Sequence, residues 1–158
     1  MNCYEFVNAD EIARGLSPFR PESVAFEAGR IMLSRIEQLF SENQSFAVET
    51  TLATKLYKNK IFQASKKGYQ VMLLFFWLEN VDIAVDRVRI RVAEGGHNFP
   101  KDVIIRRYYS GIKNLLNIYM SIVDKLIIFD NSTIISTIVA EKIINSDILI
   151  HQKISLIN

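Results

Sequence analysis

Short apolar runs alternate along this chain with longer segments in which apolar residues recur every three or four positions. The short runs have the length and composition of buried strands, and they cover residues 4–7, 45–49, 70–78 and 125–129. The periodic segments predict helices at about 21–40, 55–67, 80–94, 100–119 and, more weakly, 134–145, before a last apolar segment at 148–157. Strands separated by helices imply right-handed crossovers, so we predict an α/β fold with a three-layer, mainly parallel sheet.

Length and composition favour a single domain. The 158 residues are 49% hydrophobic and 23% charged, which is typical of a globular protein, and no linker-like segment divides them. The net charge of +2 does not by itself indicate a nucleic-acid or membrane partner. The single cysteine, Cys3, cannot form an internal disulfide, and no apolar run is long enough to span a bilayer. We therefore expect one domain over residues 1–158, located in the cytoplasm.

Polar clusters follow the predicted strands where each of them ends. They are Asn8-Ala9-Asp10, Glu49-Thr50-Thr51, Glu79-Asn80 and Asp130-Asn131-Ser132. In parallel α/β sheets, ligands bind beyond the carboxyl ends of the strands. The clusters therefore predict a binding site at that edge.

Two of these clusters allow two interpretations each. Asp10 is placed to accept a proton from an attacking hydroxyl, but it also suits the cap or first turn of a helix. Glu49, Thr50 and Thr51 could hold a polyhydroxylated substrate, whereas either threonine could instead cap the next helix. The residues alone leave both questions open.

Arginines flank a glycine pair within residues 79–121, a helical region that resembles a lid. Arg87 and Arg91 are four residues apart and share a helical face, and Arg106 and Arg107 follow the Gly95-Gly96 turn. Guanidinium groups can bind phosphate oxygens in pairs, so we expect a phosphate-contacting lid rather than a solvated surface.

His97 and the basic helices are further candidates for binding residues. His97 follows the glycines and is grouped with the phosphate-contacting residues, although an acid or a loop hydrogen-bonding role also fits. With His151 as the only other histidine, no metal site is expected. The arginine-bearing helices would also suit a nucleic-acid backbone, but neither interleaved aromatic residues nor a known binding motif supports this, so we do not expect nucleic acid as a partner. A nucleic-acid-binding domain, as an alternative, would use Lys55 to Lys67.

Several motifs together resemble the zeta-toxin family of P-loop kinases. In chain order they are Phe6-Val7-Asn8-Ala9-Asp10-Glu11-Ile12-Ala13, Glu27-Ala28-Gly29-Arg30, Ser45 through Leu52, Gly68-Tyr69-Gln70-Val71, Arg87 through His97, Pro100, Arg106-Arg107-Tyr108 and Phe129-Asp130-Asn131-Ser132. The likeness covers about residues 4–132. It implies a P-loop-kinase-like fold and ATP-dependent transfer, with Mg²⁺, of a phosphoryl group to a hydroxyl of UDP-N-acetylglucosamine.

The resemblance also implies roles for single residues. Asp10 would take the proton of the sugar hydroxyl, and Glu49 with Thr50 or Thr51 would hold the nucleotide sugar. Arg91 and one of Arg106 or Arg107 would steady the transferring phosphoryl group, with support from Arg87, while Asp130-Asn131-Ser132 would lie near the adenine. An antitoxin protein is the partner that the family implies.

The family's phosphate-binding loop is the element that this sequence lacks. No Gly-x-x-x-x-Gly-Lys-Ser/Thr stretch occurs, and only seven residues precede Asn8. Because that loop holds the phosphates and Mg²⁺, we expect a truncated domain without the usual first strand, and an isolated chain that is nearly inactive. Two alternatives are a non-catalytic remnant that binds a nucleotide sugar or a protein, and a basic nucleic-acid-binding domain.

Overall fold

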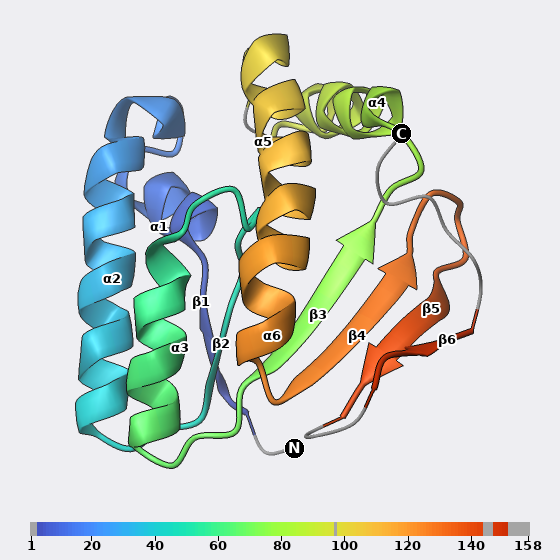
Figure 1. Cartoon of the computed structure of the whole chain (residues 1–158). Coiled ribbons are helices and arrows are strands. Elements are labelled where there is room, and N and C mark those ends of the chain that lie inside the picture. The colour runs from blue at the N-terminus through green and yellow to red at the C-terminus, as the bar shows by residue number, and fades with distance from the viewer. Residues whose placement is uncertain (1–2, 97, 144–146, 152–158) are drawn as a thin grey trace. The chain divides into compact units, whose positions relative to one another are not determined.

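The computed structural model describes residues 3–96, 98–143 and 147–151, and these form two compact units. One unit combines Met1–Thr50 with Val88–Phe99, and the other combines Thr51–Arg87 with Pro100–Asn158. The elements of the two units carry the labels shown in Figure 1. Among the described helices, none has both the length and the apolar content needed to cross a membrane.

The first unit contains a two-stranded parallel sheet and the helices that follow its first strand. β1 (Glu5–Val7) pairs with β2 (Phe46–Val48), with Phe6 opposite Ala47. Between them lie α1 (Ala9–Leu16), the 3-10 turn η1 (Pro21–Val24) and α2 (Ala25–Ser41). The apolar stripe of α2 is buried together with residues of β1 and α1, giving a core of Val7, Ala13, Ala28, Met32, Ile36, Leu39 and Phe40.

The second unit is built on a four-stranded mixed sheet. Its strands are β3 (Met72–Trp77), β4 (Lys125–Asp130), β5 (Thr137–Lys142) and β6 (Leu149–Ile150), and they lie in this order. β3 and β4 are parallel, whereas β4–β5 and β5–β6 are antiparallel. The helical elements of this unit are α3 (Leu56–Lys66), α5 (Lys101–Asn114), the π-helical turn η2 (Leu115–Tyr119) and α6 (Met120–Ile122). α4 (Val81–Ala93) contributes residues to both units.

One hydrophobic cluster joins the helices of the second unit to one face of its sheet. The cluster consists of Leu52, Trp77, Ile112, Leu115, Tyr119, Val123, Leu126, Ile128, Val139 and Ala140. Tyr57 and Ile61 of α3 pack against the same residues. α3 and the α5–α6 run therefore pack against the same cluster on one face of this sheet.

Three helices end with the same pair of backbone hydrogen bonds. In α3, Gly68 N–H donates to the Ser65 carbonyl and Tyr69 N–H to the Ala64 carbonyl, both at 3.0 Å. This is the Schellman motif, and it needs a left-handed residue, which Gly68 supplies with φ 81°. Asn43 (φ 54°) and Gly95 (φ 88°) take that position after α2 and α4. The end of α3 at Lys66 agrees with the helix predicted at about 55–67.

The α/β class and the predicted strands up to β4 are confirmed, but the helix predicted at about 134–145 is wrong. Residues 137–142 of that segment form β5. Thr137, Ile138 and Val139 are β-branched, and Val139 is fully buried against the cluster. The gain from pairing with β4 and burying this segment overrides its weak helical spacing. Of the last apolar segment, Leu149–Ile150 pairs with β5, and residues 152–158 lie outside the described part.

Candidate functional site

The first unit brings the ends of β1 and β2 together through one asparagine. Asn8 caps α1, because its Oδ1 accepts hydrogen bonds from the backbone N–H groups of Asp10 (2.7 Å) and Glu11 (3.4 Å). The Nδ2 of the same side chain donates to Glu49 Oε2 at 2.7 Å. Asn8 therefore holds the start of α1 against the residue that follows β2.

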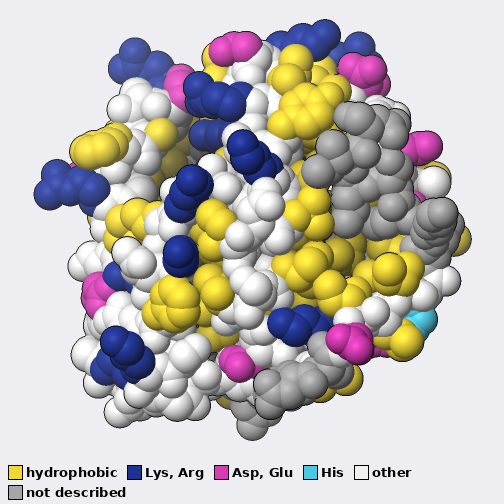
Figure 2. All heavy atoms as spheres, in the orientation of Figure 1, with side chains coloured by type: hydrophobic (Ala, Val, Ile, Leu, Met, Phe, Trp, Pro, Cys, Tyr) yellow, Lys and Arg dark blue, Asp and Glu magenta, His cyan; other side chains and the backbone are white. Residues whose placement is uncertain are grey.

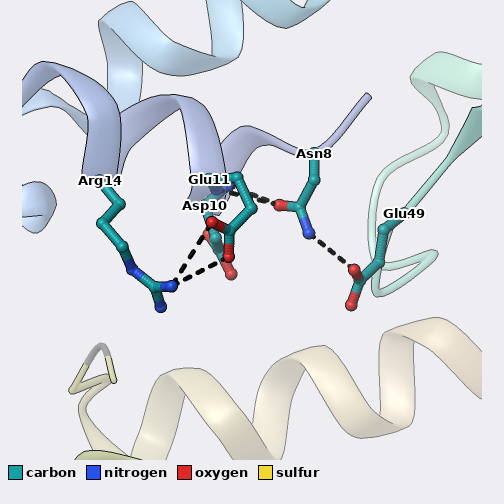
Figure 3. A network of polar contacts seen from close by, with 5 residues as sticks. All are labelled: Asn8, Asp10, Glu11, Arg14 and Glu49. Atoms are coloured by element: carbon teal, nitrogen blue, oxygen red, sulfur yellow. Dashed lines mark hydrogen bonds and ion pairs between the residues drawn. The ribbon is translucent and has the colours of Figure 1, made fainter. Parts of the chain in front are cut away.

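A cavity of about 250 Å³ opens at this junction. It is lined by Asn8, Asp10, Glu11, Arg14, Glu49, Val88 and Arg91, all of which belong to the first unit. Figure 3 shows that Asp10, Glu11 and Arg14 of α1 point toward the same space as Asn8, which caps α1, and Glu49, which follows β2. The cavity carries both signs of charge, and most of its lining residues are polar.

Some charged side chains of the cavity have hydrogen-bond or ion-pair partners in the described part of the chain, and others do not. Arg14 pairs with Glu11, with Nη1–Oε1 at 3.2 Å, one helical turn apart. Within the described residues, the carboxylate of Asp10 makes no hydrogen bond or ion pair, and Asp10 is exposed. Because the capping role belongs to Asn8, the Asp10 carboxylate is available to accept a proton from a bound hydroxyl.

Arg91 reaches the cavity from the last turn of α4. The helix ends with the Schellman bonds from Gly95 to Val92 (3.0 Å) and from Gly96 to Arg91 (2.7 Å). A Cβ added at Gly96 would lie 2.5 Å from Arg91 Cγ and 2.7 Å from its carbonyl oxygen. The glycine pair therefore fixes the end of α4 closely around Arg91, which gives the cavity a positively charged group suited to an anion.

The polar residues at the strand ends of the second unit form a separate cluster. Ser132 Oγ accepts from Glu79 N–H at 2.8 Å, and the Ser132 N–H donates to Asp130 Oδ1 at 2.9 Å. Asn131 N–H donates to the Trp77 carbonyl at 2.8 Å, so the turn after β4 is tied to the end of β3. The guanidinium of Arg87 donates to the Asn131 carbonyl.

Comparison with known proteins assigns the chain to a family. The family model described as Zeta toxin matches residues 10–142, which is more than half of the sequence. The chain belongs to the Zeta toxin family. It is also 26% identical over 102 residues to a protein of Haemophilus influenzae that is described as uncharacterized, a match covering 65% of this chain and 73% of that protein.

A solved structure supports the fold of this Zeta toxin family chain. It is a chain from the PezAT chromosomal toxin–antitoxin system of Streptococcus pneumoniae, with a TM-score of 0.59 and 15% sequence identity. The match covers 86% of the present chain and 59% of the other. The present chain therefore corresponds to about three fifths of that relative, and the likeness establishes the P-loop-kinase-like α/β fold.

The candidate site residues from the sequence are distributed over the two units. Asp10, Glu49 and Arg91 line one cavity in the first unit, and Thr50 follows Glu49 there. Thr51, Arg87, Arg106, Arg107 and Asp130-Asn131-Ser132 belong to the second unit, and His97 lies outside the described residues. Arg87 is engaged with the Asn131 carbonyl, while Arg106 is exposed on α5 and Arg107 is partly exposed.

The interpretation of Thr50 or Thr51 as a helix cap is wrong. α3 begins at Leu56 with Lys55 at the cap position, and Leu56 N–H donates to Thr54 Oγ1 at 3.2 Å. The Thr51 carbonyl instead packs against Gly111, where an added Cβ would come within 2.6 Å of it. The two threonines thus connect β2 to the second unit without starting its helix.

Sequence reasoning gave no individual role to four members of the cavity, which are Asn8, Glu11, Arg14 and Val88. Asn8 was included in a polar cluster and in a motif but not named as a cap, although an asparagine directly before an acidic first turn is a strong cap signal. Arg14 is three residues after Glu11 and four after Asp10, which places it on their face of α1. The described residues contain no group of three His, Cys, Asp or Glu side chains placed to hold a metal ion.

Proposed function

We propose that this Zeta toxin family chain forms the acceptor site of an ATP-dependent kinase that phosphorylates a nucleotide sugar such as UDP-N-acetylglucosamine. In this reaction Asp10 accepts the proton of the sugar hydroxyl as the hydroxyl oxygen attacks the γ-phosphorus of ATP, and ADP leaves. Glu49, with Thr50 or Thr51, holds the sugar, and Arg91 contacts the phosphate oxygens.

The observation that carries this proposal is the cavity shared by Asp10, Glu49 and Arg91. The carboxylate of Asp10 has no partner among the described residues, and that of Glu49 is held by Asn8 at 2.7 Å. Glu49 can therefore bind a hydroxyl that Asp10 deprotonates. A guanidinium on the same cavity suits the phosphate groups of the substrate. The cavity is therefore compatible with an acceptor that carries both hydroxyls and phosphates.

The residues of this chain fit the acceptor better than the donor. The 158 residues contain no Gly-x-x-x-x-Gly-Lys-Ser/Thr stretch, whose backbone N–H groups and hydroxyl bind the phosphates of ATP and Mg²⁺. Arg106 or Arg107 could support Arg91 at the phosphoryl group, Arg87 and His97 could assist, and Asp130-Asn131-Ser132 could lie near the adenine. We therefore propose that the isolated chain binds the nucleotide sugar but transfers phosphoryl groups very slowly.

The missing Gly-x-x-x-x-Gly-Lys-Ser/Thr stretch also suggests a second candidate function. Without the phosphate loop, the chain could serve as a non-catalytic module that binds a nucleotide sugar or a protein. We further propose an antitoxin as protein partner and a cytoplasmic location, because the structurally similar chain comes from a toxin–antitoxin system.

Titration calorimetry of the purified chain with UDP-N-acetylglucosamine tests the acceptor site. Glu49→Gln should weaken binding about tenfold, because a charge-assisted hydrogen bond to the ligand becomes a neutral one. Glu22→Gln is the matched control, since Glu22 is exposed at η1, outside the cavity, and should leave affinity unchanged. Absence of binding by the unmodified chain, or equal affinity of all three proteins, would refute the acceptor site.

Transfer of radiolabelled phosphate from ATP then separates the two candidate functions. Slow incorporation into the nucleotide sugar that disappears in Asp10→Asn supports the impaired kinase. Sugar-nucleotide binding with no incorporation above the Asp10→Asn background supports the binding module instead. Rapid turnover abolished by Asp10→Asn would contradict the proposed impairment.

A further inference from the structure

Two segments of the second unit carry positive charge without any acidic residue. Residues 51–78 contain Lys55, Lys58, Lys60, Lys66 and Lys67, and residues 103–123 contain Arg106, Arg107 and Lys113. These segments include α3 and most of the α5–α6 run. None of these residues lines the cavity of the first unit, although the proposed kinase reaction assigns Arg106 or Arg107 a supporting role beside Arg91.

On α3 the basic residues share a face with an exposed aromatic ring. Tyr57 and Ile61 face the hydrophobic cluster, so the opposite side of the helix faces solvent. Lys58, Phe62 and Lys66 are spaced at i, i+4 and i+8 on that side. Phe62 is 45% exposed, and both lysines are exposed.

α5 repeats this arrangement. Its buried side is anchored by Ile112 in the same cluster, whereas Arg106, Tyr109 and Lys113 lie on another face at i, i+3 and i+7. Tyr109 is 56% exposed, and both cations are exposed. Its ring also contacts Tyr108 edge to face, with the centroids 5.1 Å apart, which limits its freedom to rotate.

The two helices are fixed relative to one another within the second unit. Asn114 Nδ2 donates to the Leu52 carbonyl at 2.9 Å, and Tyr119 Oη to the Thr54 carbonyl at 2.6 Å, so the α5–η2 run holds the segment that leads into α3. In Figure 2, Lys and Arg side chains gather over the region of α3 and α5, with hydrophobic side chains beside them. We call the residues Lys58, Phe62, Lys66, Arg106, Tyr109 and Lys113 the basic–aromatic face.

The four cations of this face are not neutralised by the protein. Across residues 3–96, 98–143 and 147–151, the side chains of Lys58, Lys66, Arg106 and Lys113 form no ion pair. Their charge is therefore directed to solvent and available to an external anion. Exposure of the Phe62 and Tyr109 rings to water is unfavourable, and a ligand with flat rings that stacks on them would remove this cost.

We propose that the basic–aromatic face binds single-stranded nucleic acid. The cations would contact successive phosphates, and Phe62 and Tyr109 would stack on bases, which is how sequence-tolerant single-strand binding proteins work. An acidic protein would satisfy the cations but gives no reason for two exposed rings between them. On the exposed faces of α3 and α5, a basic residue lies on either side of each aromatic ring.

Fluorescence anisotropy with a labelled, mixed-sequence 20-nucleotide RNA measures the binding by the full chain. The logarithm of the binding constant should fall with the logarithm of salt concentration with a slope of about −2.8, as expected for four phosphate contacts on a single strand. Lys58→Gln/Arg106→Gln should reduce that slope by about 1.4. Phe62→Ala and Tyr109→Ala should each weaken binding roughly tenfold and leave the slope unchanged.

Arg20→Gln/Arg30→Gln is the matched control, because it removes the same charge from exposed positions of the first unit. This control should bind as the unmodified chain does, and circular dichroism checks that every variant is folded. If the control loses as much RNA affinity as Lys58→Gln/Arg106→Gln does, then binding depends on net charge alone and the proposal is overturned. RNA binding that is insensitive to both aromatic variants, or poly-glutamate binding as tight as RNA binding, would also overturn it.

Discussion

The carboxamide of Asn8 donates a hydrogen bond of 2.7 Å to the carboxylate of Glu49, 41 residues further along the chain. The other end of the same carboxamide caps α1, the helix that carries Asp10. One side chain therefore sets the separation between the proposed base and the proposed sugar-binding carboxylate. The contribution of Asn8 to the free energy of unfolding can be measured without an activity assay.

Asn8→Ala should lower the free energy of unfolding by about 1–2 kcal/mol, because it removes both the cap and the bond to Glu49. Asn8→Asp keeps a capping oxygen but places a second carboxylate beside Glu49, so it should retain the cap and still disturb the cavity. Urea denaturation of both variants checks this. Equal stability of Asn8→Ala and the unmodified protein would contradict the role given to Asn8.

Two glycines should respond in opposite directions to the same substitution. Gly111→Ala should destabilise the protein by about 1–3 kcal/mol, because the new Cβ would lie 2.6 Å from the Thr51 carbonyl oxygen in a buried position. Gly29→Ala, inside α2 with no atom within 4 Å of the new Cβ, should stabilise it by about 0.5–1 kcal/mol. Thermal and urea unfolding give the signs, and a stabilising Gly111→Ala would refute the close approach.

Tyr119→Phe should cost about 1–2 kcal/mol of stability. The ring is fully buried, and its hydroxyl donates to the Thr54 carbonyl at 2.6 Å, so the substitution removes this partly buried hydrogen bond. Tyr109→Phe is the control, because Tyr109 is 56% exposed and should change stability little. Equal effects of the two substitutions in urea denaturation would show that the Thr54 bond contributes nothing.

Stability should fall as pH rises above about 10. Burial raises the pKa of Tyr108 and of Tyr119 above the ordinary value of 10.0, and the neighbouring Tyr109 raises the Tyr108 pKa further. A raised pKa means that the folded state holds these protons more tightly than the unfolded state, so their contribution is present below pH 10 and lost above it. Urea midpoints between pH 8 and 11 test this, and Tyr108→Phe should flatten the curve relative to Tyr109→Phe.

The elements that could be predicted from the sequence are those whose signals are local. The strands β1 to β4 are short apolar runs, and α3 ends at Gly68 because a left-handed residue is needed there. β5 could not be found this way. Val139 and its neighbours form a strand because β4 offers an edge and the cluster buries Val139, and neither condition is visible within the segment itself.

The sequence by itself determined the α/β class, the family motifs and the chemical identity of Asp10, Glu49 and Arg91, because apolar periodicity and residue type are properties of the chain. Only the tertiary structure decided that these three side chains line one cavity, that Asn8 bonds Glu49 while it caps α1, and that the basic–aromatic face stays exposed while the other sides of α3 and α5 are buried. The physical reason is that such arrangements depend on hydrogen bonds and packing between residues far apart in sequence, as between Asn8 and Glu49.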